Sequence, residues 1–163
     1  MIYSPAMNIF YLDEDVTECA KMHVDKHCVK MILEYAQLMS TAHRALAAEL
    51  ACADLYKSTH VNHPSAVWVR KSRYNYIWLY NLWLALMAEY TYRYGRHHAC
   101  ERLIDALGKL PINISHASFT EPPCCMPDIY NNGSAVDSYR QYYIMDKCHL
   151  FAWKNRPVPD WAK

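Results

Sequence analysis

The sequence contains little glycine, and its charges nearly cancel. Only 3 of the 163 residues are Gly, and hydrophobic residues make up 53% of the chain. This composition is typical of a globular, helix-rich protein, so we expect neither disorder nor long flexible linkers. A formal net charge of +1 is not that of a domain that binds nucleic acid mainly through bulk electrostatics. A local phosphate-facing patch is still allowed, and its members would be Arg70, Lys71, Arg73, Arg93, Arg96, His97 and His98.

Long apolar runs and paired cysteine motifs are also missing. The richest apolar segment, 77–87, is interrupted by Asn81. It is shorter than the roughly 18 residues that can span a membrane, so we expect no membrane partner. The 7 Cys residues form neither a CxxC pair nor a zinc-ribbon pattern. Because no signal-peptide pattern is present, we expect mostly buried thiols in a reducing cytoplasm.

Local signals predict one all-α domain over residues 1–163. We expect a compact bundle of about four helices, with a short extended arm at the N-terminus and an extended tail at the C-terminus. The arm is the aromatic, β-prone segment 9–12. Asp15 is predicted to cap a first helix that runs to about Leu55, with Glu18 in the capping-box position. The sequence leaves open whether the protein forms an oligomer.

A second group of elements follows a polar loop that ends at Pro64. A helical region begins near Ser65, and Ser72 then caps a long helix that ends at Tyr94, before Gly95. This helix is apolar or aromatic almost all round, which places it at the centre of the fold against the first helix. The remaining predicted elements are a helix over about 97–107, a helix capped by Ser134 that runs to about Trp153, and an extended tail over 155–161.

The first predicted helix carries a narrow polar stripe. At roughly 100° per residue, six polar positions fall within about 40° of one another. Apolar residues border them on both sides, which is unusual for a solvated helix face. The stripe could be the solvent-exposed face of an amphipathic helix, with an ordinary Lys30–Glu34 ion pair. Alternatively, it lines a cleft in which these polar groups bind a ligand or take part in catalysis. The six positions are His23, His27, Lys30, Glu34, Gln37 and Thr41.

Four residues of the stripe are candidate catalytic residues: Glu34, Lys30, His27 and His23. A lysine in a partly apolar cleft loses its proton more readily, and its free amine could attack a sugar C1′ or a carbonyl to form an imine. Glu34 could then move protons or stabilise a developing sugar cation. Against this, a protonated Lys30 paired with Glu34 would be a poor nucleophile.

A metal site is an alternative use of the same stripe. His23 and His27 have the spacing of two metal ligands on one helix. The sequence does not show which residue would supply a third ligand, so we predict no metal or other cofactor. The residues considered for that third ligand are Glu34, His43, His60 and His63.

A second candidate site lies around the loop before the long helix. Imidazole, amide, indole and guanidinium groups there could hold a phosphate and stack a base, although a loop histidine is more often merely exposed. The predicted ligand-binding residues are His60, His63, Trp68, Arg70, Asn75 and Arg44. Aromatic and basic residues of the last helix could form a nucleic-acid face or pack in the core; they are Tyr139, Arg140, Tyr142, Tyr143 and Lys147.

Several segments carry a family resemblance. The sequences MNIFYLDED at 7–15, HVDKH at 23–27 and KMILE at 30–34 resemble a family of small, uncharacterised bacteriophage proteins. In layout, the chain is similar to the phage-type pyrimidine-dimer DNA glycosylases, which have an N-terminal arm, a catalytic glutamate on the first helix, a long central helix and an aromatic, basic tail. This resemblance implies a phage protein in the cytoplasm of an infected bacterium, with nucleic acid or a nucleotide as its partner and Glu34 as its catalytic carboxylate.

The chain departs from those glycosylases at the nucleophile. They use the α-amine of a threonine that removal of the initiator Met exposes, whereas here bulky Ile2 follows Met1 and Asn8 follows Met7. Imine chemistry would therefore move to Lys30. The sequence thus predicts a glycosylase- or lyase-like enzyme that acts on a nucleobase or nucleotide. The alternatives are an anti-defence protein that binds a nucleotide signal without turnover, and a metal hydrolase that uses the two stripe histidines.

Overall fold

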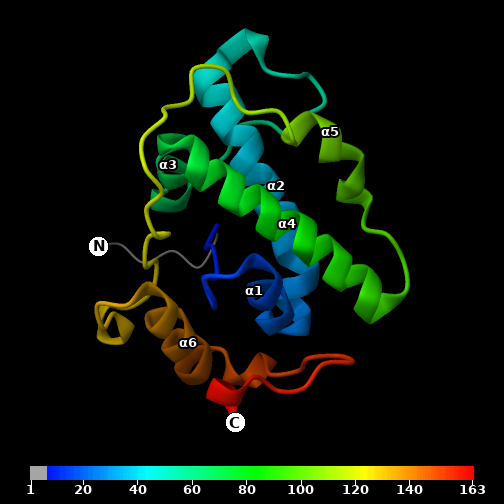
Figure 1. Ribbon diagram of the computed structural model, residues 1–163, viewed down its shortest axis with the longest axis vertical. Coiled ribbons are helices and arrows are strands. Elements are labelled where there is room, and N and C mark those ends of the chain that lie inside the picture. Colours follow the sequence, from blue (N-terminus) through cyan, green and yellow to red (C-terminus); the bar gives the residue numbers. More distant parts are fainter. Residues whose placement is uncertain (1–6) are drawn as a thin grey trace.

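The fold is built from helices. The computed structural model describes residues 7–163, and every regular element in that range is helical, which confirms the all-α class. Six α-helices are present instead of about four, and short 3-10 turns accompany them (Figure 1). The long helix α4 (Arg73–Tyr94) crosses the centre of the molecule and packs on α1, α2 and α3. No helix in the described part of the chain has the length and hydropathy needed to cross a membrane.

The predicted first helix is two helices. The first, α1 (Val16–Met22), ends at His23, and α2 (Asp25–Ala47) begins after Val24. His23 and Val24 have ψ angles of 128° and 156°, so the backbone leaves the helical region there. The prediction of one continuous helix is therefore wrong.

Side chains from distant parts of the chain stabilise this break. Arg93 of α4 donates hydrogen bonds to the carbonyls of Lys21 and His23. Trp153 of the C-terminal tail donates its indole N–H to the Met22 carbonyl at 2.8 Å. The carbonyls at the end of α1 thus find partners outside the helix. Hydrophobic periodicity cannot reveal these partners, because they lie far away in the sequence.

The caps that the sequence indicates are present. The Asp15 carboxylate accepts from the Thr17 and Glu18 N–H groups, and the Ser134 hydroxyl accepts from Asp137 N–H at the start of α6 (Ala135–Asp146). Ser72 caps α4, which ends before Gly95 in the left-handed conformation with φ 71°. The helix α3 (Pro64–Lys71) has Pro in its first turn.

Helix ends were predicted less well than helix starts. The helix α2 ends at Ala47, followed by a 3-10 turn over Ala48–Leu50, instead of running to Leu55. Similarly, α6 ends at Asp146 rather than near Trp153. The predicted helix over 97–107 is a 3-10 turn over Ala99–Leu103 that continues into the short α5 (Ile104–Leu107).

The N-terminal arm passes through the core. Residues 7–12 are all buried and form no strand. The ring of Phe10 stacks on His27 of α2 and contacts Tyr143 of α6, and Tyr11 contacts Trp78 of α4. The arm therefore lies among α2, α4 and α6, which places its backbone beside the polar stripe of α2.

Candidate functional site

Glu34 lies where the arm meets α2. Its side chain is almost completely buried, with 7% exposure for the residue. Oε1 accepts a hydrogen bond from the Met7 backbone N–H at 3.1 Å. Oε2 is buried without a hydrogen-bond partner and lies 3.9 Å from Lys30 Nζ. Glu34 therefore has one oxygen held by the backbone and another that is available to a ligand or a proton.

Lys30 lies at the surface beside Glu34. Its side chain is 66% exposed, so water solvates the amine. The sequence-based idea of a lysine enclosed in an apolar cleft therefore does not fit this residue. The short distance to Glu34 still allows proton exchange between the two groups through small movements of the long lysine side chain.

His27 is the next stripe residue toward the start of α2. Its ring is buried, stacks on Phe10 with a centroid distance of 4.2 Å, and places Nδ1 2.6 Å from the Tyr143 hydroxyl. Burial lowers the pKa of His27 to about 2, and repulsion from His23, Lys147 and Lys30 adds to this effect. His27 is thus a neutral imidazole at pH 7, which links α2 to α6.

His23 has a structural position. The Cys19 carbonyl can only accept, so His23 Nδ1 donates to it at 2.8 Å, and Nε2 accepts from the Tyr35 hydroxyl at 2.8 Å. Both ring nitrogens are therefore occupied, and the helix break separates His23 from His27. The premise of two metal ligands one turn apart on a single helix is wrong. Within residues 7–163, no group of three or more His, Cys, Asp or Glu side chains is arranged to hold a metal ion.

Acid should destabilise the protein through His23. Burial lowers its pKa from 6.5 to about 4, and the Arg93 charge contributes. Above pH 6.5 both states are neutral and His23 has no effect. Below it, the unfolded chain gains a proton that the folded protein does not, so the free energy of unfolding falls by up to about 1.4 kcal/mol per pH unit until pH 4. Urea unfolding at several pH values should show a smaller slope for His23→Gln than for the wild type; equal slopes would contradict this.

Lys147 directly follows the last residue of α6. Its amine lies 5.3 Å from the centre of the Tyr142 ring, and its backbone N–H bonds the carbonyl of Tyr143, whose hydroxyl contacts His27. Burial lowers the pKa of Lys147, and repulsion from the Lys30 charge lowers it further. The charge of Lys147 is therefore felt by Lys30 and His27 of α2. Sequence reasoning placed Lys147 only on a general aromatic face, because nothing in the sequence pairs α6 with α2.

The polar groups of the second predicted site serve local structure. Trp68 Nε1 donates to the Thr120 carbonyl at 2.9 Å. The Asn75 amide bonds the Trp68 carbonyl, the Thr120 hydroxyl and the Thr120 N–H. These contacts fasten Thr120 to α3 and α4. Other groups hold their own loop: His63 accepts from Ser65 N–H, His60 contacts Thr59, Arg70 donates to the Val61 carbonyl, and Arg44 donates to the carbonyls of Leu55 and Tyr56.

The two predicted sites occupy different parts of α2. Thr41, the last stripe residue, bonds Thr59 of the loop, whereas Glu34 faces the arm. Seven residues of helix, about 10 Å, separate them. Because of this separation, we keep Glu34, Lys30, His27 and Lys147 as the candidate site and treat the loop residues as a separate group.

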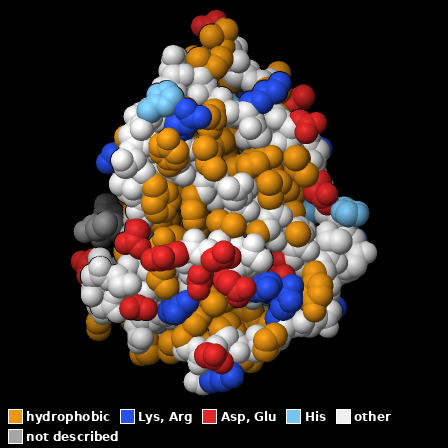
Figure 2. All heavy atoms as spheres, in the orientation of Figure 1, with side chains coloured by type: hydrophobic (Ala, Val, Ile, Leu, Met, Phe, Trp, Pro, Cys, Tyr) orange, Lys and Arg blue, Asp and Glu red, His pale blue; other side chains and the backbone are white. Residues whose placement is uncertain are grey.

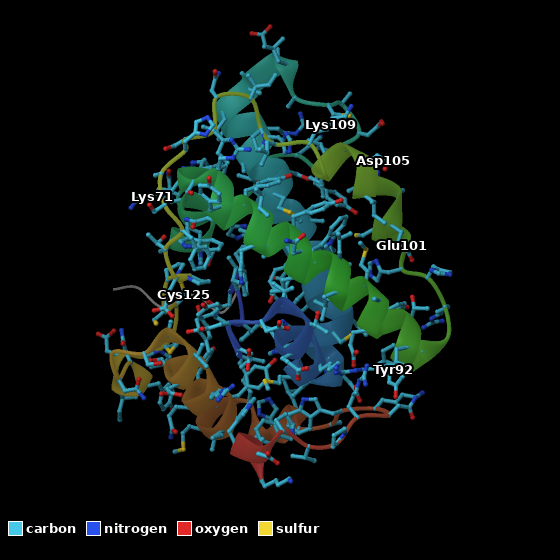
Figure 3. The ribbon with its side chains drawn as sticks, viewed as in Figure 1. Lys71, Tyr92, Glu101, Asp105, Lys109 and Cys125 are labelled. Atoms are coloured by element: carbon cyan, nitrogen blue, oxygen red, sulfur yellow. The ribbon has the colours of Figure 1, made fainter. Side chains whose placement is uncertain are left out.

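Cys125 lies between α3 and α6 in Figure 3, with its sulfur 3.8 Å from the Ser65 hydroxyl.

One member of the sequence-based phosphate patch lies inside the protein. Arg93 is 2% exposed and contacts Glu89 and Asp25 at 2.7 and 2.9 Å, so its charge is used inside the protein. On the face shown in Figure 2, Asp and Glu side chains gather in a band across the lower half. Arg93 is therefore not available to a phosphate-binding surface.

Comparisons with known proteins add no relative. No family model matches the chain, and neither the curated proteins nor the solved structures give a significant match.

Proposed function

We propose that this protein acts on a nucleobase or nucleotide as a DNA glycosylase- or lyase-like enzyme, with Glu34 and Lys30 at its centre. The observation that supports this is the buried Glu34 carboxylate, whose Oε2 lacks a hydrogen-bond partner beside the Lys30 amine. Most buried polar groups are paired, so an unpaired carboxylate oxygen next to a solvated amine is a candidate for proton transfer. In this proposal the protein works in the cytoplasm of a phage-infected bacterium.

The proposed reaction uses the two groups in sequence. Glu34 takes a proton from the Lys30 ammonium, and the free amine bonds to the sugar C1′. The bond from C1′ to the base breaks, its electron pair leaves with the base, and Glu34 passes the proton to the base. The attached amine then loses a proton to the ring oxygen as the sugar opens, which gives the imine. Subsequent elimination needs a base near C2′, and the Glu34 carboxylate fits that role.

Borohydride trapping on duplex DNA with an abasic site tests this proposal. Wild-type protein should form a covalent adduct, Lys30→Ala should lose it, and the control Lys26→Ala, at an exposed position on the same helix, should retain it. An adduct that survives Lys30→Ala but not Lys147→Ala would overturn the role of Lys30 and support an enzyme that uses the partly buried amine. The absence of any adduct with the wild type would contradict imine chemistry.

A non-catalytic nucleotide-binding protein is the second candidate. The charges of Lys30 and Lys147 repel each other across α2 and α6, and a phosphate between them would relieve this repulsion. Such a protein could act against host defence by capturing a nucleotide signal, as a monomer or as an oligomer. Calorimetry with linear and cyclic nucleotides, followed by chromatography of the recovered ligand, separates capture from turnover. Unchanged ligand supports capture, and altered ligand supports catalysis.

A further inference from the structure

Asn132 and Gly133 form an exposed loop directly before α6. Both residues are exposed to solvent, and Ser134, which follows them, caps the helix. Gly133 has a φ of 91°, and a Cβ atom added to it would meet nothing within 4 Å. Because glycine lacks that atom, no side chain of its own shields the Gly133 nitrogen from the Asn132 side chain. The backbone nitrogen is therefore open to a close approach.

The Asn132 side chain folds back over the Gly133 peptide. Its Oδ1 accepts a hydrogen bond from the Ser134 N–H at 3.1 Å, which makes an Asx turn. An oxygen that reaches the backbone two residues ahead carries its amide carbon, Cγ, over the intervening peptide nitrogen. The N–H of Gly133 donates to Asn131 Oδ1 at 3.3 Å, a long hydrogen bond that water or hydroxide can replace. Asn132 Cγ and Gly133 N thus form a reactive pair.

Hydrogen-bond donors surround the Asn132 carbonyl oxygen. One donor is the Ser134 N–H, and the other is the Ser138 hydroxyl, whose oxygen lies 3.2 Å from Oδ1. In the unmodified protein this hydroxyl lies closer to the Ser134 carbonyl, at 2.6 Å. Its single proton can turn to Oδ1 when negative charge grows there. Donors placed where an oxyanion develops stabilise the transition state.

We propose that Asn132 is a site of self-modification, in which Gly133 N attacks Asn132 Cγ. Hydroxide removes the proton from Gly133 N, and the nitrogen bonds to Cγ. The bond from Cγ to the side-chain nitrogen then breaks, and that nitrogen takes a proton from water and leaves as ammonia, which regenerates hydroxide. Water opens the resulting succinimide at either carbonyl carbon and gives aspartate or isoaspartate. This chemistry is independent of the reaction proposed for Glu34.

The two products should affect α6 differently. Aspartate keeps an oxygen for the Ser134 N–H, and its negative charge near the start of the helix is favourable. Isoaspartate lengthens the main chain by one carbon, which displaces the residue 132 N–H from the Ser138 oxygen, its acceptor at 3.1 Å. Since α6 also carries Tyr143, whose hydroxyl contacts His27, isoaspartate should loosen a helix that borders the candidate site. Thermal unfolding of the two separated products measures this difference.

Peptide mapping of the full-length folded protein, incubated at neutral and mildly alkaline pH, tests the inference. Mass spectrometry should find the amide of Asn132 replaced by a carboxyl group, and the rate should rise with pH because the attacking nitrogen must lose its proton. Asn131 is the internal control. It makes a similar turn, but the next nitrogen belongs to Asn132, which has a Cβ atom and donates to Ser138. An unchanged Asn132, or equal modification of Asn131 and Asn132, would overturn the inference.

Ser138→Ala tests whether the folded structure assists the reaction. The folded variant should react about 10-fold more slowly than the folded wild type, because it lacks the hydroxyl that can donate to the oxyanion. In urea that unfolds both proteins, the two rates should be equal, since the hydroxyl then has no fixed place beside Asn132. A folded variant that reacts as fast as the wild type, or a rate difference that persists in urea, would overturn the role of Ser138.

Discussion

Exchange of Glu34 for Gln should slow strand cleavage at an abasic site by about 100- to 10,000-fold. Glutamine keeps an oxygen that can accept from the Met7 N–H, so the contact between the arm and α2 is retained. It removes the carboxylate that would exchange protons with Lys30 and abstract a proton from the sugar. The loss should therefore fall on the chemical step and not on folding. Single-turnover cleavage of abasic duplex DNA measures the effect.

Glu49→Gln provides a matched control. Glu49 is exposed on the 3-10 turn that follows α2, and no hydrogen bond or ion pair is assigned to it; its exchange should leave both the cleavage rate and the unfolding temperature unchanged. If Glu34→Gln cleaves abasic DNA as fast as the wild type, Glu34 is not the proton-transferring group. A large fall in unfolding temperature would show instead that Glu34 serves mainly to hold the arm.

Arg93→Met should lower the free energy of unfolding by about 3–5 kcal/mol. The Arg93 guanidinium is buried and contacts two carboxylates, Glu89 at 2.7 Å and Asp25 at 2.9 Å, as well as two backbone carbonyls of the α1–α2 break. Burial alone would raise the pKa of Glu89, but hydrogen bonds from Arg156 and Arg93 lower it overall. Methionine fills similar space and leaves these acceptors without their donor. Urea unfolding measures the loss.

Two further variants define the role of Arg93. Arg93→Lys keeps the charge but cannot donate in several directions at once, so it should lose part of the stability. Arg96→Met, a control at an exposed position just beyond α4, should change the free energy of unfolding by no more than about 0.5 kcal/mol. Arg93→Met and Arg96→Met proteins of equal stability would show that the buried contacts contribute little. The C-terminal tail should also become more mobile in Arg93→Met. The Tyr92 hydroxyl (labelled in Figure 3) donates to the Asn155 carbonyl, and Glu89 pairs with Arg156. Both contacts hold the tail to the part of α4 that contains Arg93.

The local features of this fold could be predicted from the sequence. Asp15, Ser72 and Ser134 cap helices, and Gly95 ends the longest apolar helix, because each effect depends on neighbours within one helical turn. The same holds for the pairing of Lys30 with Glu34, which are four residues apart on α2. The helix break at His23 could not be predicted, because its carbonyl partners come from Arg93 and Trp153.

The candidate site shows the same division. Periodicity along α2 placed His27, Lys30 and Glu34 on one face, since a helix repeats every 3.6 residues. Only the tertiary structure brought the arm onto Glu34, left Glu34 Oε2 buried without a hydrogen-bond partner, and placed Lys147, just after α6, where its charge acts on Lys30. The sequence by itself determined the helical class, the caps and the polar stripe, which depend on short-range backbone geometry. Burial, desolvation and the pairing of distant charges decided which of these polar groups remain available for chemistry.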